Sequence, residues 1–455
     1  MAKHTDEIRA LLADAAERGM RYLAGVAERR VYPEARSIER LEDILKAPFP
    51  DRPTEASKVI LLIDEFGSPA TVASAGGRYF GFVTGGALPA TVAANWLAGA
   101  WDQNSFSFVS SPAAALFEEA ALRWLKQALR LPAGAEGALV AGATMANFTC
   151  LAAARHEVLM RAGWDVERQG LFAAPEVTVI VGEEVHASVV KVLAMLGLGR
   201  ERLTRVPVDG QGRMRPEAMP EIAGPTILCL QAGNVNSGAF DPAATIIPRA
   251  RAKGAWVHVD GAFGLWARAC PGLAALAEGF EAVDSWATDA HKWLNVPYDC
   301  GVALVREPEP LRRAMSVSGA YIAPSGRRDA IDVTPDSSRR ARAVEVWAAL
   351  KSLGRSGLAE MIERNCRQAR WLAGELSKAG IEVLNDVVLN QIVVSFGDDD
   401  RTTRAISALQ RSGEIWCGGT TWRGRAGMRV SVSSWATRQA DMERALKAIL
   451  AAGRQ

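Results

Sequence analysis

Short apolar runs separated by longer segments of helical periodicity dominate the chain between about residues 90 and 306. Each run is five or six residues long and lacks the polar alternation of a half-exposed strand: GALVAG (137–142), VTVIVG (177–182), TILCLQ (226–231), WVHVD (256–260) and GVALV (301–305). Strands that are covered on both faces and joined by helices are typical of βα units. The pattern therefore predicts a largely parallel α/β sheet.

The two ends of the chain carry different patterns. Apolar residues recur at helical spacing over residues 5–30 and stop at Pro33, which predicts an N-terminal helical arm. The segment GGRYFGFVTGGALP (76–89) predicts a loop whose backbone approaches a neighbouring segment closely. Beyond residue 306, a long helical pattern (341–376) precedes two strand-like runs and a last helix (439–452), which predicts a smaller α+β C-terminal domain.

Composition places the chain among ordinary globular proteins, since 49% of its 455 residues are hydrophobic and 23% are charged. The net charge of +2 and the lack of like-charge runs argue against nucleic-acid and membrane-surface partners and favour a small-molecule substrate. Neither a secretory signal nor an apolar stretch long enough to span a bilayer is evident. The six cysteines lie far apart without a CxxC motif, so we expect no metal site, no disulfides and a cytoplasmic location.

Candidate chemical groups cluster at the predicted strand ends, where open α/β sheets bind their ligands. Three of the five histidines, His186, His258 and His291, lie in or just after these strands. Asp260 ends the run WVHVD, where an unpaired carboxylate carries a large desolvation penalty, so a cationic group should meet it. Lys292 follows in SWATDAHKWLNVPYDCG, on a predicted loop. Taken singly, each histidine also fits a structural role, and Asp260 also fits a helix cap or a structural salt bridge.

The order of these motifs resembles the group II pyridoxal-phosphate decarboxylases, the family of aromatic-amino-acid and glutamate decarboxylases. The shared order is a glycine-rich turn, a histidine, HVD, HKW and DCG. The similarity covers nearly the whole chain, from the segment ending at Pro89 through SPAAALFEEAALRWL (111–125) to the C-terminal TWRGRAGMRVSVSSWAT. The resemblance implies the aspartate aminotransferase-like fold type I of pyridoxal-phosphate enzymes, in which a large, mostly parallel sheet domain carries an N-terminal helical arm and a smaller α+β domain.

The resemblance also implies a division of the chain and a homodimer. Residues 1–85 would form the helical arm and a dimer-contacting segment, residues 86–310 the large cofactor-binding domain, and residues 311–455 the small C-terminal domain. Enzymes of this fold usually build two sites across a dimer interface, which fits the helical arm.

Pyridoxal 5′-phosphate is the cofactor that the resemblance implies, and Lys292, Asp260 and His186 are the catalytic residues carried over. Lys292 would hold the cofactor as a Schiff base, the internal aldimine, until the substrate amine displaces it. Asp260 would face the pyridine nitrogen and keep it protonated, which makes the ring an electron sink. His186 would stack on one face of the ring and Ala262 would pack on the other.

Other residues carried over would bind the phosphate and the substrate. The strand-to-helix turn at Ala143 and Thr144 offers free backbone N–H groups and a helix dipole to the phosphate, and Asp289 and His291 would lie near the same group. Thr84 and Phe82 of the glycine-rich segment are expected at the substrate. In this family the residue that matches Thr84 comes from the partner subunit.

The sequence departs from the family at the step that should finish the reaction. The aromatic-amino-acid decarboxylases carry a tyrosine on a mobile loop, thought to deliver the last proton. Residues 327–342 (RRDAIDVTPDSSRRAR) contain no tyrosine, and Tyr321, which lies earlier, is expected to be structural. His186 or a water molecule is the alternative donor.

Further departures concern the cofactor's surroundings. The family's usual Gly-Thr-Thr reads Gly233-Asn234-Val235 here, which leaves Asn234 or Asn236 to replace the lost hydroxyl. Asp289 stands where asparagine is common, and its carboxylate would repel a phosphate unless it is paired, protonated or turned away. Three arginines are further candidates to border the site: Arg339, Arg340 and Arg342.

The leading hypothesis is a pyridoxal-phosphate-dependent carboxy-lyase that converts an L-amino acid, with aromatic substrates slightly preferred, to the amine and carbon dioxide. Loss of the loop tyrosine keeps an aldehyde synthase on the same scaffold open, because its replacement is associated in the family with oxidative decarboxylation. An aminotransferase is disfavoured, because that chemistry usually uses a different aromatic stacking partner. A cofactor-binding homologue without turnover is a third possibility, and it stays open because Asp289 and Val235 depart from the residues usual in the family.

Overall fold

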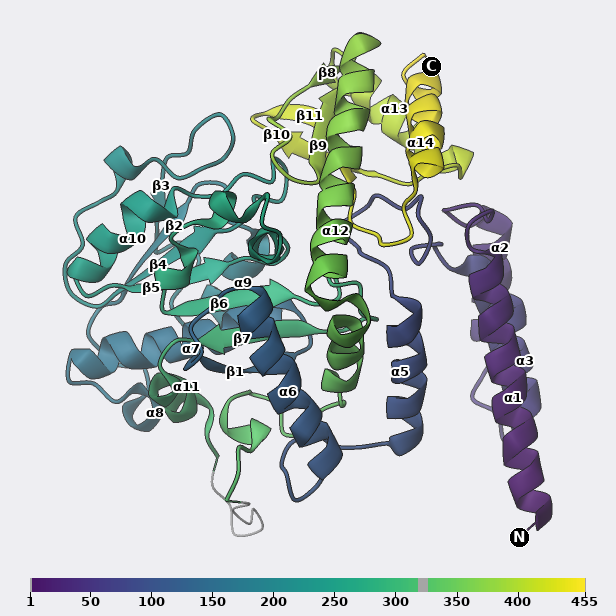
Figure 1. Ribbon diagram of the computed structural model, residues 1–455, viewed down its shortest axis with the longest axis horizontal. Coiled ribbons are helices and arrows are strands. Elements are labelled where there is room, and N and C mark those ends of the chain that lie inside the picture. The colour runs from purple at the N-terminus through teal and green to yellow at the C-terminus, as the bar shows by residue number, and fades with distance from the viewer. Residues whose placement is uncertain (1, 318–325, 455) are drawn as a thin grey trace.

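The computed structural model describes residues 2–317 and 326–454, so Tyr321 lies outside the described residues. The chain forms a large sheet between layers of helices, a second and smaller sheet, and a helical arm beside them (Figure 1). None of the helices in the described part of the chain combines the length and the apolarity that crossing a membrane requires.

The N-terminal arm is helical, as the sequence pattern predicts. It consists of α1 (Ala2–Gly25), α2 (Ala35–Leu45), α3 (Ala56–Leu62), a π-helical turn η1 (Ile63–Gly67) and the short α4 (Ser68–Ala70). Figure 1 shows α1 running alongside α5 (Pro89–Trp101) at one side of the molecule. A Cβ placed on Gly19 of α1 would lie 3.3 Å from the Trp96 ring of α5, so the arm and the body touch at this point.

The large sheet is mostly parallel. Its seven strands, counted over the described residues, have the order β1-β7-β6-β5-β4-β2-β3. The five predicted runs all form strands of this sheet, which confirms the predicted α/β class. The strands are β1 (Glu136–Val140), β2 (Thr178–Gly182), β3 (Leu203–Val206), β4 (Thr226–Gln231), β5 (Trp256–Asp260), β6 (Ser285–Asp289) and β7 (Gly301–Val305).

One strand runs against the others. β7 pairs antiparallel with both β1 and β6, whereas its apolar run reads like those of the parallel strands. The reason is the connection from β6, residues 290–300, which is too short for the crossover helix that a parallel neighbour needs. This short connection carries Lys292.

The sequence pattern also misses β6 itself, because the strand contains Ser285, Thr288 and Asp289. All five residues of β6 are nevertheless buried. The Ser285 hydroxyl lies 2.9 Å from Trp256 Nε1 and 2.9 Å from His258 Nδ1 on the neighbouring strand β5, so polar partners within the sheet replace water.

Two hydrophobic cores cover the two faces of the large sheet, which is why its strands are apolar throughout. Ser111 begins α6 by accepting a hydrogen bond from the backbone N–H of Ala114, with Pro112 at the first helical position. The helices around the sheet are α6 (Pro112–Ala128), α7 (Ala143–Arg161), α8 (Val166–Gln169), α9 (Ala187–Met195), α10 (Ala243–Ala252) and α11 (Pro308–Met315). Short 3₁₀ turns join them: η2 (Pro216–Ala218), η3 (Gly264–Ala269), η4 (Ala274–Ala277), η5 (Phe280–Ala282) and η6 (Ala330–Asp332).

The long helix α12 (Ala343–Lys378) leads from the large sheet to the small one (Figure 1). It is broken at Gly354, whose φ of 59° and ψ of −174° lie outside the helical region and are tolerated by glycine. The small sheet has the order β10-β11-β9-β8 and is antiparallel. It contains β8 (Glu382–Val383), β9 (Gln391–Ser395), β10 (Gly418–Trp422) and β11 (Arg425–Ser431), with α13 (Asp399–Ser412) and α14 (Gln439–Ala452) beside it.

Candidate active site

A cavity of about 560 Å³ lies where the carboxyl ends of the parallel strands meet. In the sheet, Gln231 at the end of β4 lies beside Asp260 at the end of β5, and Val140 at the end of β1 lies beside Gly301 at the start of β7. The cavity therefore collects side chains from loops that are far apart in sequence. All eight residues expected at the cofactor line it: Ala143, Thr144, His186, Asp260, Ala262, Asp289, His291 and Lys292.

Lys292 reaches this cavity from the short β6–β7 connection. Its Nζ lies 2.9 Å from Asp289 Oδ2, and the Asp289 carboxylate is almost fully buried. The other oxygen, Asp289 Oδ1, accepts a hydrogen bond of 2.6 Å from the backbone N–H of Ala143. Asp289 is thus paired, and its negative charge is opposed by both a lysine and the N-terminus of α7.

Asp260 has no such partner. Its side chain is 7% exposed and lines the cavity, and Oδ1 accepts one backbone hydrogen bond of 3.2 Å from Ala262. No lysine, arginine or histidine of the described residues forms an ion pair with it, so the cationic group expected beside Asp260 is not a side chain of the described part of the chain. A buried carboxylate without a counter-charge is costly unless a ligand supplies the positive group.

His186 lines the same cavity at the start of α9. Its Nδ1 accepts a hydrogen bond of 3.2 Å from the backbone N–H of Ser188 and lies 2.7 Å from the Ser188 hydroxyl. Desolvation lowers the pKa of His186 and outweighs the opposite effect of the Asp260 carboxylate. The ring is therefore neutral near pH 7 and is fixed in orientation by its role as helix cap.

The N-terminus of α7 faces the cavity opposite the sheet. Because the Ala143 amide is bound to Asp289, the amides of Thr144 and Met145 are the first-turn donors without an intrahelical acceptor. His291 lies beside this turn. Its Nδ1 accepts a hydrogen bond of 3.0 Å from the backbone N–H of Cys300, so the proton of the neutral ring is on Nε2. Burial lowers the pKa of His291.

The glycine-rich segment forms another wall of the cavity. A Cβ on Gly85 would lie 1.7 Å from the carbonyl oxygen of Lys292, so only glycine allows this close approach, as the sequence predicts. Phe82 and Val83 line the cavity and both adopt left-handed backbone angles, with φ of 53° and 57°. Thr84 approaches the cavity of its own chain, since its hydroxyl lies 3.4 Å from that of Tyr298.

Two cavity residues were not anticipated from the sequence. Tyr298, in the connection that also carries Lys292, packs its ring on that of His291 with centroids 4.2 Å apart. Arg429, on β11, enters from the small sheet and donates a hydrogen bond of 3.1 Å to the Val235 carbonyl. An arginine inside the strand-like run GMRVSVSS was the signal that could have revealed it.

Several other candidates do not reach the cavity. His258 is fully buried, bonded through Nε2 to Asn147 at 2.8 Å, and burial lowers its pKa to about 3, so its role is structural. The expectation that Asn234 or Asn236 replaces the missing hydroxyl is wrong. Asn234 Oδ1 accepts hydrogen bonds from backbone N–H groups within its own turn, and Asn236 Oδ1 accepts a hydrogen bond from the Thr420 hydroxyl.

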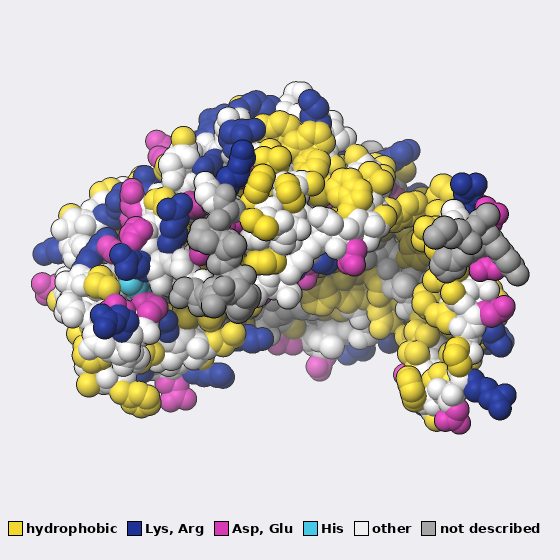
Figure 2. All heavy atoms as spheres, turned by 90° about the horizontal axis from the view of Figure 1, so that it is seen from below, with side chains coloured by type: hydrophobic (Ala, Val, Ile, Leu, Met, Phe, Trp, Pro, Cys, Tyr) yellow, Lys and Arg dark blue, Asp and Glu magenta, His cyan; other side chains and the backbone are white. Residues whose placement is uncertain are grey.

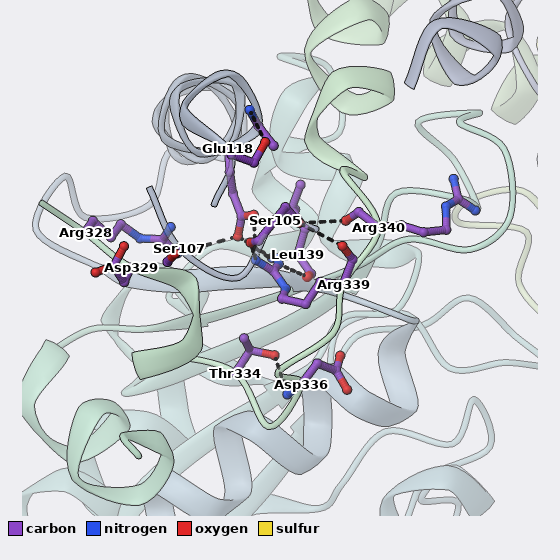
Figure 3. Close-up of polar contacts among 12 residues, drawn as sticks. Ser105, Ser107, Glu118, Leu139, Arg328, Asp329, Thr334, Asp336, Arg339 and Arg340 are labelled. Carbon is purple, nitrogen blue, oxygen red and sulfur yellow. Dashed lines mark hydrogen bonds and ion pairs between the residues drawn. The ribbon is translucent and has the colours of Figure 1, made fainter. Parts of the chain in front are cut away.

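The expectation for the three arginines is also wrong. Arg339 is fully buried against Glu118 and β1 (Figure 3), and it is not among the residues that line the cavity. Arg340 pairs with Glu345 and Arg342 with Asp299. Structural ion pairs neutralise the charges of these three arginines, and periodicity along the sequence does not reveal such pairs.

A lysine amine, a buried carboxylate that lacks a protein cation, and a helix N-terminus all face one cavity. These groups fit a flat, phosphorylated aldehyde with a basic ring nitrogen: the lysine can bind the aldehyde, the carboxylate the protonated nitrogen and the helix the phosphate. The fold and the site together define the class of fold type I pyridoxal-phosphate proteins.

Comparison with known families makes the assignment specific. Residues 41–396 match the model of the pyridoxal-dependent decarboxylase conserved domain. The chain therefore belongs to the pyridoxal-phosphate-dependent decarboxylase family, which confirms the resemblance and the cofactor inferred from the motif order.

The chain is similar in sequence to relatives that have different activities. An acidic amino acid decarboxylase of Xenopus tropicalis is 30% identical over 322 residues, which cover 68% of this chain and 62% of the relative. A phenylacetaldehyde synthase of Arabidopsis thaliana is 25% identical over 374 residues, which cover 76% of this chain and 75% of the relative. The chain spans about three fifths of the length of the acidic amino acid decarboxylases it matches.

The fold agrees with a solved structure of the same class. The structure described as Oryza sativa TDC with PLP and tryptamine superposes with a TM-score of 0.89, covering 99% of this chain and 98% of the other, at 23% identity. This match confirms the predicted fold type I architecture.

Proposed function

We propose that this protein is a decarboxylase that uses pyridoxal phosphate to convert an L-amino acid, preferably an aromatic one, to its amine and carbon dioxide. The observation that carries the proposal is the unpaired, buried Asp260 carboxylate in the cavity that contains Lys292. A structural salt bridge would have placed a protein cation there instead.

Each group has a definable task in this reaction. Lys292 would hold the cofactor covalently through its amine, and Asp260 would keep a proton on the ring nitrogen. His186 and Ala262, which both line the cavity, would hold the ring between them. The amides of Thr144 and Met145, with the Nε2–H of His291, would bind the phosphate, while the hydrogen bond from the Ala143 amide would keep the Asp289 carboxylate turned toward the helix backbone. When bound, the cofactor supplies a ring that accepts the electron pair released with carbon dioxide.

Arg429 is the residue that we assign to the substrate carboxylate. It has no carboxylate partner among the described residues, and burial lowers its pKa without abolishing its charge. Lys292 and Arg429 are the only lysine and arginine among the described residues that line the cavity, so no second cation is left for an acidic side chain. Phe82, Val83 and Tyr298 surround the remaining space, which supports an aromatic substrate.

The test is a panel of amino acids assayed simultaneously for carbon dioxide, amine, ammonia and hydrogen peroxide. We expect equimolar amine and carbon dioxide, highest with aromatic substrates. Lys292→Ala should abolish turnover and the attachment of cofactor that borohydride fixes, whereas Lys191→Ala, on the exposed face of α9, should retain both. Absence of carbon dioxide with every amino acid, or borohydride fixation that persists in Lys292→Ala, would overturn the proposal.

Aldehyde synthesis is the second candidate, because no tyrosine lies in residues 327–342 and a phenylacetaldehyde synthase is among the relatives. In that reaction dioxygen and water are consumed, and aldehyde, ammonia and hydrogen peroxide accompany the carbon dioxide. Equimolar peroxide and ammonia in the panel would establish this candidate, and their absence would reject it.

The functional unit that we propose is a homodimer in a reducing cytoplasm. A hollow of about 1340 Å³ separates the arm from the body, with hydrophobic side chains along its walls (Figure 2). Apolar residues of the arm are exposed in the single chain, among them Ile8, Leu12 and Met20. Large exposed apolar patches mark interaction sites, and a second copy of this chain supplies a matching one. The six buried, unpaired cysteines accord with a reducing compartment.

A further inference from the structure

Tyr298 places a phenol in the cavity of a chain whose loop lacks the family's tyrosine. It lies six residues after Lys292 on the same β6–β7 connection, and 55% of its surface is exposed, toward the cavity that it lines. The connection is held rigidly: the Asn295 amide donates to the carbonyls of Trp293 and Ser433, at 2.9 and 3.1 Å. The backbone of this connection is therefore anchored between Lys292 and Tyr298.

The contacts of Tyr298 leave its hydroxyl directed at a polar group. The ring packs against His291, and the hydroxyl donates to Thr84 Oγ1 at 3.4 Å. Thr84 is partly exposed and forms a link from the phenol toward solvent. Lys292 and Asp289 are the charged groups that act on the phenol.

We propose that Tyr298 is the proton donor that completes the decarboxylation, in place of a tyrosine on the loop. This inference rests on the proposed function. If Tyr298 donates this proton, the product is the amine, so Tyr298 determines whether amine or aldehyde forms.

The step balances without an oxidant. The bond between Cα and the carboxyl carbon breaks, carbon dioxide leaves, and the electron pair of that bond is shared between Cα and the ring that the cofactor would supply. The O–H bond of Tyr298 then breaks, its proton forms the new C–H bond at Cα, and the phenolate regains a proton from water through the Thr84 hydroxyl.

His186, the other donor in the cavity, is less suited to this step. Its Nδ1 is occupied by Ser188, and the ring is neutral near pH 7, so its remaining Nε2–H is a much weaker acid than a phenol. Burial raises the pKa of Tyr298, while Thr84 and Lys292 oppose that rise, so the phenol stays protonated at neutral pH and ready to donate.

The decisive variant is Tyr298→Phe, which keeps the ring on His291 and removes only the hydroxyl. We expect its amine formation to fall at least about 100-fold, the typical range for loss of a general acid, with cofactor affinity and melting temperature unchanged. Any residual turnover should shift toward aldehyde, ammonia and peroxide. Tyr79→Phe is the matched control, because Tyr79 stacks on Trp416 outside the residues that line the cavity.

A second measurement avoids turnover altogether. The chain has five tyrosines, and the difference in ultraviolet titration between the cofactor-free parent and Tyr298→Phe reports Tyr298 together with the smaller change at Tyr79, whose pKa Tyr298 raises. Thr84→Val should move that titration to higher pH, because the Thr84 hydrogen bond lowers the pKa of Tyr298. An unmoved titration would overturn the coupling of the two hydroxyls.

The outcomes separate this inference from the proposed function. If the parent protein releases no carbon dioxide, the proposed function fails. If the parent does so and Tyr298→Phe forms amine at the parent rate, only the assignment of Tyr298 fails. A Tyr298→Phe variant that loses cofactor affinity or stability also overturns it, because the hydroxyl would then be structural.

Discussion

Two buried carboxylates face the cavity region, and their partners give them opposite roles. Asp289 is neutralised by Lys292 and by the Ala143 amide, so it organises the protein before any ligand arrives. Asp260 accepts one weak backbone hydrogen bond and leaves its charge available. At this scale the function depends on which charge remains uncompensated, because an unpaired buried charge is the one that binds a cationic ligand.

Replacing the unpaired charge is the direct test of this reading. Asp260→Asn keeps the size of the side chain but cannot hold a proton on the ring nitrogen. We expect kcat/KM to fall at least about 100-fold, equivalent to ~2.7 kcal/mol, together with weaker cofactor binding. Steady-state kinetics and cofactor titration measure both, with Asp400→Asn, on exposed α13, as the control. Unchanged cofactor affinity in Asp260→Asn would contradict the assigned role.

Arg429 permits a test that separates binding from chemistry. Arg429→Met removes a charge-assisted hydrogen bond worth about 1.5–3 kcal/mol, so the KM for the amino acid should rise roughly 10- to 100-fold. The product amine lacks the carboxylate, so its inhibition constant should stay the same. An equal loss of affinity for amino acid and amine would show that Arg429 only supports the fold.

Elements are fixed around the site by a buried ion pair. Arg339 donates to both Glu118 oxygens, at 3.0 and 3.1 Å, and to the Leu139 carbonyl at 2.6 Å, so the segment before α12 is tied to α6 and β1 (Figure 3). Arg328 adds a second, longer contact to Glu118 at 3.6 Å. Burial alone would raise the pKa of Glu118, but these arginines and their hydrogen bonds lower it.

Breaking this pair from one side should be costly. Arg339→Met leaves Glu118 buried and underpaired, and we expect a loss of about 3–5 kcal/mol in the free energy of unfolding. Arg313→Ala, which breaks an exposed pair with Glu309, should cost less than about 1 kcal/mol. Urea unfolding of the variants measures both, and equal effects would contradict the importance of burial.

The same pair predicts an acid dependence of stability. Because the folded pKa of Glu118 lies below its unfolded value, the pair stabilises the protein above the unfolded pKa and loses this contribution as the pH falls through the folded one. Glu118→Gln should therefore flatten the pH dependence of unfolding below about pH 5. A slope identical to that of the parent would show that other carboxylates account for the acid sensitivity.

The whole molecule exposes a surface that a single chain does not need. The arm and the body face each other across an apolar hollow, and Leu12 on the arm is 62% exposed. A residue so exposed contributes little to the folding of one chain, but it can contribute strongly to an interface between two.

Oligomeric state should respond to this surface alone. Leu12→Glu should shift the protein from the proposed dimer toward monomer in sedimentation velocity while leaving the far-ultraviolet circular dichroism unchanged. Phe172→Glu, at a 95% exposed position after α8, should remain dimeric. A parent protein that sediments as a monomer over the whole concentration range would contradict the dimer.

The sequence by itself determined the α/β class, the strand-end positions of His186 and Asp260, the loop position of Lys292, and the close backbone approach of residues 76–89. These features are local: apolar runs mark strands, and the residue that follows a buried parallel strand lies at the sheet edge wherever the strand falls in the order. The family could be inferred for the same reason, because its motifs are contiguous in sequence.

Only the tertiary structure decided the direction of β7, the burial of polar β6, and the fate of the arginines at 339, 340 and 342. Each depends on a partner distant in sequence: β1 for β7, Trp256 for Ser285, and Glu118 for Arg339. Tyr298 and Arg429 likewise could be recognised as site residues only from the structure, which places both in the cavity lining. Charge compensation and packing are properties of neighbours in space, which periodicity along a chain does not contain.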